Sequence, residues 1–135
     1  MPKPIIQVVA GAIRENGHYL ITQRNASAVL PLLWEFPGGR VEDGETPQQA
    51  LHRELLHRLG IRIEISGLIS TTDKQYPDYT VHLQMYLCEL IAPRPQARNV
   101  RDFKWVTMDE IDKFEFTPAD QKAMDALLFG GAQFH

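Results

Sequence analysis

The residues best placed to do chemistry together are Glu54, His57 and Arg58, which stand three and four positions apart. On an α-helix this spacing puts all three side chains on one face. Glu54 and His57 have the Glu-x-x-His spacing of carboxylate-bridged metal sites, and imidazole suits zinc, iron or manganese, yet one such pair supplies too few ligands. Arg58 has two readings that stay open: a direct phosphate ligand, together with Arg53 and Arg40, or an ordinary ion-pair partner of Glu54 on the helix surface.

The helix that positions these residues has clear local signals at both ends. Thr46 is a favourable N-cap, Pro47 occupies the first helical position and Gln49 completes a capping box. Gly60 provides a residue that tolerates the left-handed backbone of a helix end. The sequence therefore predicts a helix from about Pro47 to the residue before Gly60.

Strand-like segments surround this helix. They are expected at residues 5–13, 19–22, 61–72, 80–90 and 103–106, with a second amphipathic helix at 118–129. The first two are expected to form an antiparallel hairpin around the turn-like Glu15-Asn16-Gly17. The tripeptide Pro37-Gly38-Gly39 requires a special backbone path, and a loop is expected to follow it and to run to about Glu45. The strands at 61–72 and 80–90 are expected to pair through residues 73–79. The order of strands, helix, strands, helix indicates an α/β fold with a mixed sheet between helices.

Composition bounds the protein's class. A chain of 135 residues with 44% hydrophobic content suits a single domain over residues 1–135. The net charge of −3 disfavours duplex nucleic acid as a partner, and the apolar runs are too short for a membrane span. We expect a soluble cytoplasmic protein in which Cys88, the one cysteine, is a buried packing residue.

The segment from Gly39 to Ile61 resembles the Nudix box. That pattern is a glycine, five residues, a glutamate, seven residues, then Arg-Glu-apolar-any-Glu-Glu-any-Gly-apolar. The positions that match it are Gly39, Glu45, Arg53, Glu54, Leu55, Gly60 and Ile61. The resemblance extends to the lead-in at residues 34–39 and to residues 116–120, and looks closest to the MutT-like branch.

The resemblance implies a Nudix-type α/β/α sandwich and hydrolysis of nucleoside triphosphates or related nucleoside diphosphate derivatives, with oxidised or modified deoxynucleotides among the candidates. Pyrophosphate would be released with Mg²⁺ or Mn²⁺ as cofactor. Glu54 would be the catalytic residue and a metal ligand, with the carbonyl of Gly38 as a second ligand. Glu45 and Arg53 would bridge the loop and the helix, and Gly39 and Gly60 would be structural. A homodimer is compatible with this fold.

The resemblance also suggests where the substrate binds. Arg24 and Arg40 would lie near the nucleotide, with Arg40 at the phosphates. Asp120 would read the base edge, since a carboxylate accepts hydrogen bonds from an exocyclic amino group; the other reading is a favourable charge in the first turn of the second helix. Phe36, Tyr79 and Phe116 are candidates for stacking on a base, although core packing explains each of them as well.

The sequence departs from the family pattern where metal would bind. His57 and Arg58 stand where the box pattern has its paired glutamates. Similar proteins often have a further metal-binding glutamate six residues before a tryptophan, and Asn99 stands at that position before Trp105. Exchanging a carboxylate for a guanidinium beside a divalent ion costs several kcal/mol even at an effective dielectric of about 20. An alternative to the hydrolase is therefore a catalytically impaired protein that binds a nucleotide as a sensor or interaction module. Relocated metal ligands are a third option, for which the sequence has no positive signature.

Overall fold

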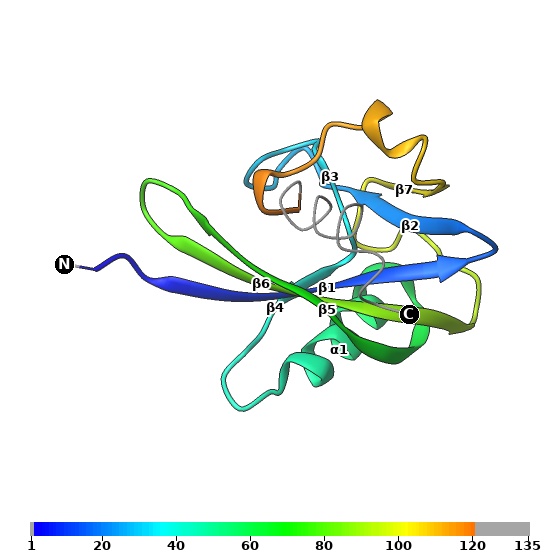
Figure 1. Ribbon diagram of the computed structural model, residues 1–135, viewed down its shortest axis with the longest axis horizontal. Helices are drawn as coiled ribbons and strands as arrows, with labels where there is room; N and C mark the ends of the chain where they lie inside the picture. Colours follow the sequence, from blue (N-terminus) through cyan, green and yellow to red (C-terminus); the bar gives the residue numbers. More distant parts are fainter. Residues whose placement is uncertain (1, 121–135) are drawn as a thin grey trace.

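The computed structural model describes residues 2–120, which form a mixed sheet with a helix against one face (Figure 1). β1 (Ile5–Glu15) and β2 (His18–Gln23) pair as an antiparallel hairpin. Asn16 and Gly17 both have positive φ, at 51° and 76°, as two-residue hairpin turns require. The N-terminal hairpin expected from the sequence is confirmed.

The centre of the sheet is a parallel pairing between distant strands. β5 (Arg62–Gln75) and β6 (Thr80–Ala92) form a long antiparallel hairpin, and β6 runs parallel to β1. The strand order is β3-β2-β1-β6-β5, so β1 lies between β2 and β6 in Figure 1. The turn between β5 and β6 is shorter than expected, because β5 continues to Gln75 and the amide of Tyr76 closes the turn on the carbonyl of Tyr79.

Short elements complete the sheet and its edge: β3 (Trp34–Glu35), β4 (Gly38–Arg40), β7 (Asp102–Val106) and a 3₁₀ turn, η1 (Ile111–Lys113). β3 and β7 pair with β2, and β4 pairs with β1. The loop expected directly after Gly39 was wrong at its first residue, since Gly38–Arg40 forms a strand. An added Cβ on Gly38 would lie 1.9 Å from the carbonyl oxygen of Val9, so a glycine here lets β4 lie against β1.

α1 (Pro47–Leu59) begins and ends as the sequence predicts. The hydroxyl of Thr46 accepts from the Gln49 amide at 3.1 Å, and the Thr46 amide donates to the Gln49 side chain at 2.9 Å. Gly60 ends the helix with φ of 68° and ψ of 24°. Both cap signals therefore fix where α1 begins and where it ends.

Apolar side chains pack on both faces of the sheet, as expected for a mixed sheet in an α/β fold. The cluster between the sheet and α1 includes Val9, Ile13, Leu20, Leu51, Leu55, Ile61 and Cys88, and the cluster on the other face includes Ala10, Ile21, Trp34, Phe36, Met85 and Phe116. Cys88 is buried as expected, and burial raises the pKa of its thiol to about 12.

The second helix and the lack of a membrane span can be examined only within the residues that the structure describes. Residues 118–120 are helical, and the rest of the helix expected at 118–129 lies outside the described residues. Within residues 2–120, no helix combines the length and apolar character needed to cross a membrane.

Candidate functional site

A cleft of about 490 Å³ lies along β1 and β4 and brings together residues from distant parts of the chain. α1 supplies part of one wall, and the turn between β5 and β6 and residues 117–120 supply others. The expected site residues in its lining are Arg24, Gly38, Gly39, Arg40, Glu54, Arg58 and Asp120. Glu45, Arg53 and Gly60 are not among the lining residues.

Glu54 is the buried carboxylate of α1, with 8% of its surface exposed. Its Oε1 accepts from Nη1 of Arg53 and its Oε2 accepts from Nε of Arg58, each at 2.8 Å. The carboxyl group lies directly over Gly39, where an added Cβ would be 2.4 Å from the Glu54 Cδ. Gly39 therefore leaves room for the Glu54 carboxyl group. This steric reason for a glycine at position 39 is separate from any requirement of its backbone conformation.

Arg53 ties α1 to the loop that precedes it. Its Nε donates to Oε2 of Glu45 at 2.7 Å, and its Nη2 donates to Oε1 of Glu45 and to the carbonyl of Arg40, each at 2.9 Å. These bonds lower the pKa of Glu45 from 4.5 to about 2 and raise the pKa of Arg53 above its usual range. The structure thus places Arg53 between Glu45 and Glu54, where it orients both carboxylates.

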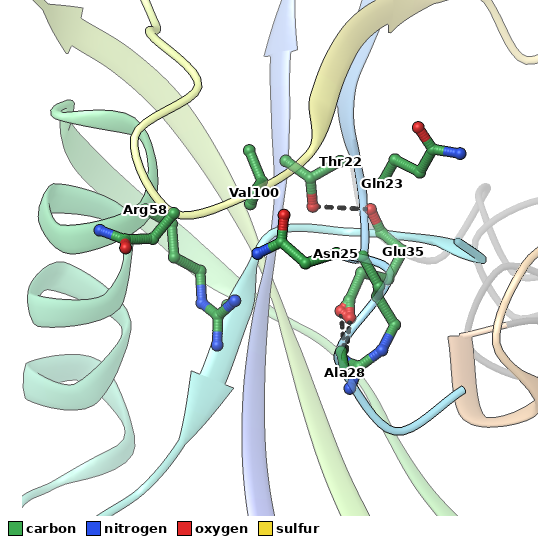
Figure 2. Close-up of a pocket in the computed structure, with 10 residues that line it drawn as sticks. Thr22, Gln23, Asn25, Ala28, Glu35, Arg58 and Val100 are labelled. Atoms are coloured by element: carbon green, nitrogen blue, oxygen red, sulfur yellow. Dashed lines mark hydrogen bonds and ion pairs between the residues drawn. The ribbon is translucent and has the colours of Figure 1, made fainter. Parts of the chain in front are cut away.

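Arg58 follows Glu54 by one helical turn and is one-third exposed. Besides the main cleft, it lines a smaller cavity of about 110 Å³. Figure 2 shows its side chain extending from α1 toward the space that separates it from Asn25 and Glu35. Arg58 is therefore both an ion-pair partner of Glu54 and a cleft residue.

His57 and Asn99 do not join Glu54. His57 is exposed and is not among the residues lining the cleft. The side-chain amide of Asn99 donates to the His57 carbonyl at 2.8 Å, and the backbone amides of Arg98 and Asn99 donate to the Arg58 carbonyl. The loop before β7 thus caps the last turn of α1, a role for Asn99 that the sequence analysis missed because it depends on a contact between segments about 40 residues apart.

The residues around Glu54 do not fit a divalent metal ion. Among residues 2–120, no group of three or more histidine, cysteine, aspartate or glutamate side chains lies close enough to hold one. Both oxygens of Glu54 are already paired with guanidinium groups, and Mg²⁺ requires several oxygen ligands. Gly38 lines the cleft, but one backbone carbonyl does not replace carboxylates. The Mg²⁺ or Mn²⁺ expected from the resemblance has no fitting donor set at the box.

Asp120 is the second buried carboxyl of the cleft. Its Oδ1 accepts from the Phe36 amide at 2.9 Å and its Oδ2 accepts from the Thr117 hydroxyl at 2.8 Å. Burial, with a smaller contribution from the charge of Glu35, raises its pKa from 3.8 to about 7. The group therefore gains or loses a proton near neutral pH.

Arg24 follows β2 and lines the cleft. Its Nη1 donates to Glu35 at 2.8 Å and its Nε donates to the Val29 carbonyl at 2.7 Å. Glu35 was not singled out from the sequence, because nothing local shows that it faces Arg24 rather than solvent. The ion pair of Arg24 with Glu35 therefore adds no net charge to this part of the cleft.

Aromatic side chains line part of the cleft. Tyr76 and Tyr79 stack with ring centroids 5.1 Å apart at an interplanar angle of 29°, and both line the cleft together with Phe36. Phe116 packs against Phe36 in the core at 5.8 Å and is not a lining residue. Of the three aromatic candidates, Phe36 and Tyr79 line the cleft. Tyr76 also lines it, although nothing in the sequence singled out this residue.

Comparison with known proteins agrees with this arrangement. A family model described as NUDIX domain matches residues 8–126. The chain is 38% identical over 129 residues to an 8-oxo-dGTP diphosphatase from Haemophilus influenzae, covering 95% of each chain. It is 31% identical to a CTP pyrophosphohydrolase from Escherichia coli, covering 92% of each.

Solved structures share the fold. The solution structure of the E. coli ORF135 protein superposes with a TM-score of 0.82 at 29% identity, covering 98% of this chain and 94% of that one. The crystal structure of a MutT protein from Methanosarcina mazei Go1 gives 0.84 at 21% identity, covering 100% and 99%. The α/β/α sandwich with a mixed sheet expected from the sequence is confirmed. With the box at the cleft wall and a family match over most of its length, the chain belongs to the NUDIX domain family.

Proposed function

We propose that this protein hydrolyses nucleoside triphosphates, with oxidised or otherwise modified deoxynucleotides as the leading candidates, to a monophosphate and pyrophosphate. The observation that carries the proposal is one cleft that holds cationic box residues, Arg40 and Arg58, together with a buried carboxyl at Asp120. Relatives named 8-oxo-dGTP diphosphatase and CTP pyrophosphohydrolase support it and favour a hydrolase over a binding module. Since nucleotide pools are cytoplasmic, we place the activity in the cytoplasm.

Each cleft residue has a role in this proposal. Arg40 is exposed at the cleft and meets the phosphate chain, while Asp120 accepts a hydrogen bond from an exocyclic amino group of the base. Glu54 is the acceptor that orients the attacking water. Both oxygens of Glu54 already accept hydrogen bonds from arginine, so they are only partly available to the water and turnover is expected to be slow.

The test is pyrophosphate release from a panel of nucleoside triphosphates that includes dGTP, 8-oxo-dGTP and CTP, each with Mg²⁺, with Mn²⁺ and with EDTA. We expect release from at least one nucleotide and its loss in Glu54→Gln, which keeps the size of the side chain. Arg62→Gln is the control, because Arg62 is exposed at the start of β5 and does not line the cleft. No release from any nucleotide, or equal release by Glu54→Gln, contradicts the proposal.

A further inference from the structure

The two box carboxylates nearest α1 are both paired with arginine, and a third carboxylate, Glu42, lies 3.9 Å from Arg53. Glu45 and Glu54 contribute two carboxylates, and Arg53 and Arg58 contribute two guanidinium groups that pair with them at 2.7 to 2.9 Å. A divalent cation would meet two positive charges at the place where carboxylates would have to hold it. At these short distances like charges repel strongly, even in a medium of intermediate dielectric. Neither oxygen of Glu54 is therefore left unpaired for a cation, whereas Arg58 still reaches the cleft.

Arg58 keeps free hydrogen-bonding capacity toward the cleft. Its Nε is used by Glu54, while Nη1 and Nη2 donate to no oxygen of the described residues. The side chain remains one-third exposed and lines both cavities. The planar fork of a guanidinium matches two phosphate oxygens, and Glu54 holds this fork at a fixed position.

Arg40 supplies a second cationic group along the same wall. It ends β4, its side chain is exposed, and it lines the main cleft with Arg58. The backbone at this point is held by the bond from Arg53 to the Arg40 carbonyl at 2.9 Å. A chain of linked phosphates that spans the cleft wall can thus contact two arginines from different elements.

We propose that Arg58 takes the place of the divalent cation in this protein, so that the phosphate chain of the nucleotide binds directly to arginine and its binding requires no metal. The inference rests on the proposed function only for the class of ligand. The alternative is that Arg58 serves only as the ion-pair partner of Glu54. In that case, replacing Arg58 would not change the affinity of the protein for phosphate.

The first test uses the protein unchanged and inorganic triphosphate as probe, so that the base has no influence. Calorimetric titration in EDTA is expected to show binding, and added Mg²⁺ is expected to leave the affinity unchanged or weaken it, because Mg²⁺ complexes the free probe. Direct titration of the protein with Mn²⁺, followed by the electron paramagnetic resonance signal of free Mn²⁺, is expected to show no site at the box. Triphosphate binding that appears only with Mg²⁺ or Mn²⁺ overturns the proposal.

The second test removes the charge. Arg58→Gln is expected to weaken triphosphate binding in EDTA about tenfold, as for the loss of one charged hydrogen-bonding partner, and Arg58→Lys is expected to lie between the two. Arg62→Gln is the matched control and is expected to bind as the unchanged protein does. Thermal unfolding of each variant checks folding, and equal affinity of a folded Arg58→Gln variant contradicts the proposal.

The two proposals fail separately. Metal-free triphosphate binding without any pyrophosphate release would reject the hydrolase and leave the role of Arg58 standing. Pyrophosphate release with strictly metal-dependent triphosphate binding would do the reverse.

Discussion

The carboxyl group of Glu54 lies so close over Gly39 that a methyl group on Gly39 would be 2.4 Å from the Glu54 Cδ. This contact joins the second glycine of β4 to the buried acid of α1, and Arg53 and Arg58 then pair with that acid from two directions. The glycine, the acid and the two arginines thus form one packed unit in which a change at Gly39 displaces the rest.

Gly39→Ala tests this unit. The added methyl group must push Glu54 out of its place, so we expect a loss of about 1–3 kcal/mol in the free energy of unfolding, as for overpacked cores, and loss of pyrophosphate release. Urea unfolding measures the first and the nucleotide assay the second. Gly67→Ala is the matched control, because a Cβ there meets nothing within 4 Å and its φ is not positive. A Gly39→Ala variant as stable and as active as Gly67→Ala would contradict the packing.

Asp120 predicts a pH dependence of stability. Its pKa is about 7 in the folded protein against an ordinary 3.8, so the folded state binds the proton more tightly than the unfolded state does. This contribution to stability is therefore fully present below about pH 4 and is lost as pH rises to about 7. Thermal unfolding between pH 4 and pH 8 measures it, and Asp120→Asn is expected to remove this part of the slope.

The control for Asp120→Asn is Asp109→Asn, at an exposed position before η1. We expect Asp109→Asn to keep the slope of the unchanged protein. Equal slopes in Asp120→Asn and the unchanged protein would mean that Asp120 is not the group that titrates.

Replacement of Tyr79 is expected to weaken binding of the base without weakening binding of the phosphates. It lines the cleft and stacks with Tyr76, so its ring is a candidate face for a nucleobase. Loss of base–aromatic stacking weakens binding by about 1–3 kcal/mol, so we expect Tyr79→Ala to raise the KM for a nucleoside triphosphate roughly five- to 150-fold. Tyr79→Phe should have little effect. If Tyr79→Ala weakens inorganic triphosphate binding as much as nucleotide binding, the ring does not act on the base.

Local signals in the sequence predicted much of this structure. The turn at Asn16-Gly17 and the caps at Thr46 and Gly60 depend on neighbouring residues, so the first hairpin and α1 were expected correctly. The box spacing likewise predicted that Glu54 and Arg58 share a face. These features need no knowledge of the rest of the chain.

Contacts between distant segments were not predictable in the same way. The parallel pairing of β1 with β6, the Arg24–Glu35 ion pair and the bond from Asn99 to the His57 carbonyl each join segments whose sequences give no sign of one another. Their formation depends on how the whole sheet closes. The strand at Gly38–Arg40 was missed for the same reason, because its partner is β1 rather than a neighbour in sequence.

The most direct measurement is pyrophosphate release by the double variant His57→Glu with Arg58→Glu, in Mg²⁺, beside the unchanged protein. If the cleft is a nucleotide pyrophosphohydrolase site limited by these two residues, the variant restores carboxylates at the box, and release in Mg²⁺ should rise at least about tenfold, equivalent to about 1.4 kcal/mol in the barrier. It should also become sensitive to EDTA. A folded double variant that binds the nucleotide but shows no gain in release would contradict the account.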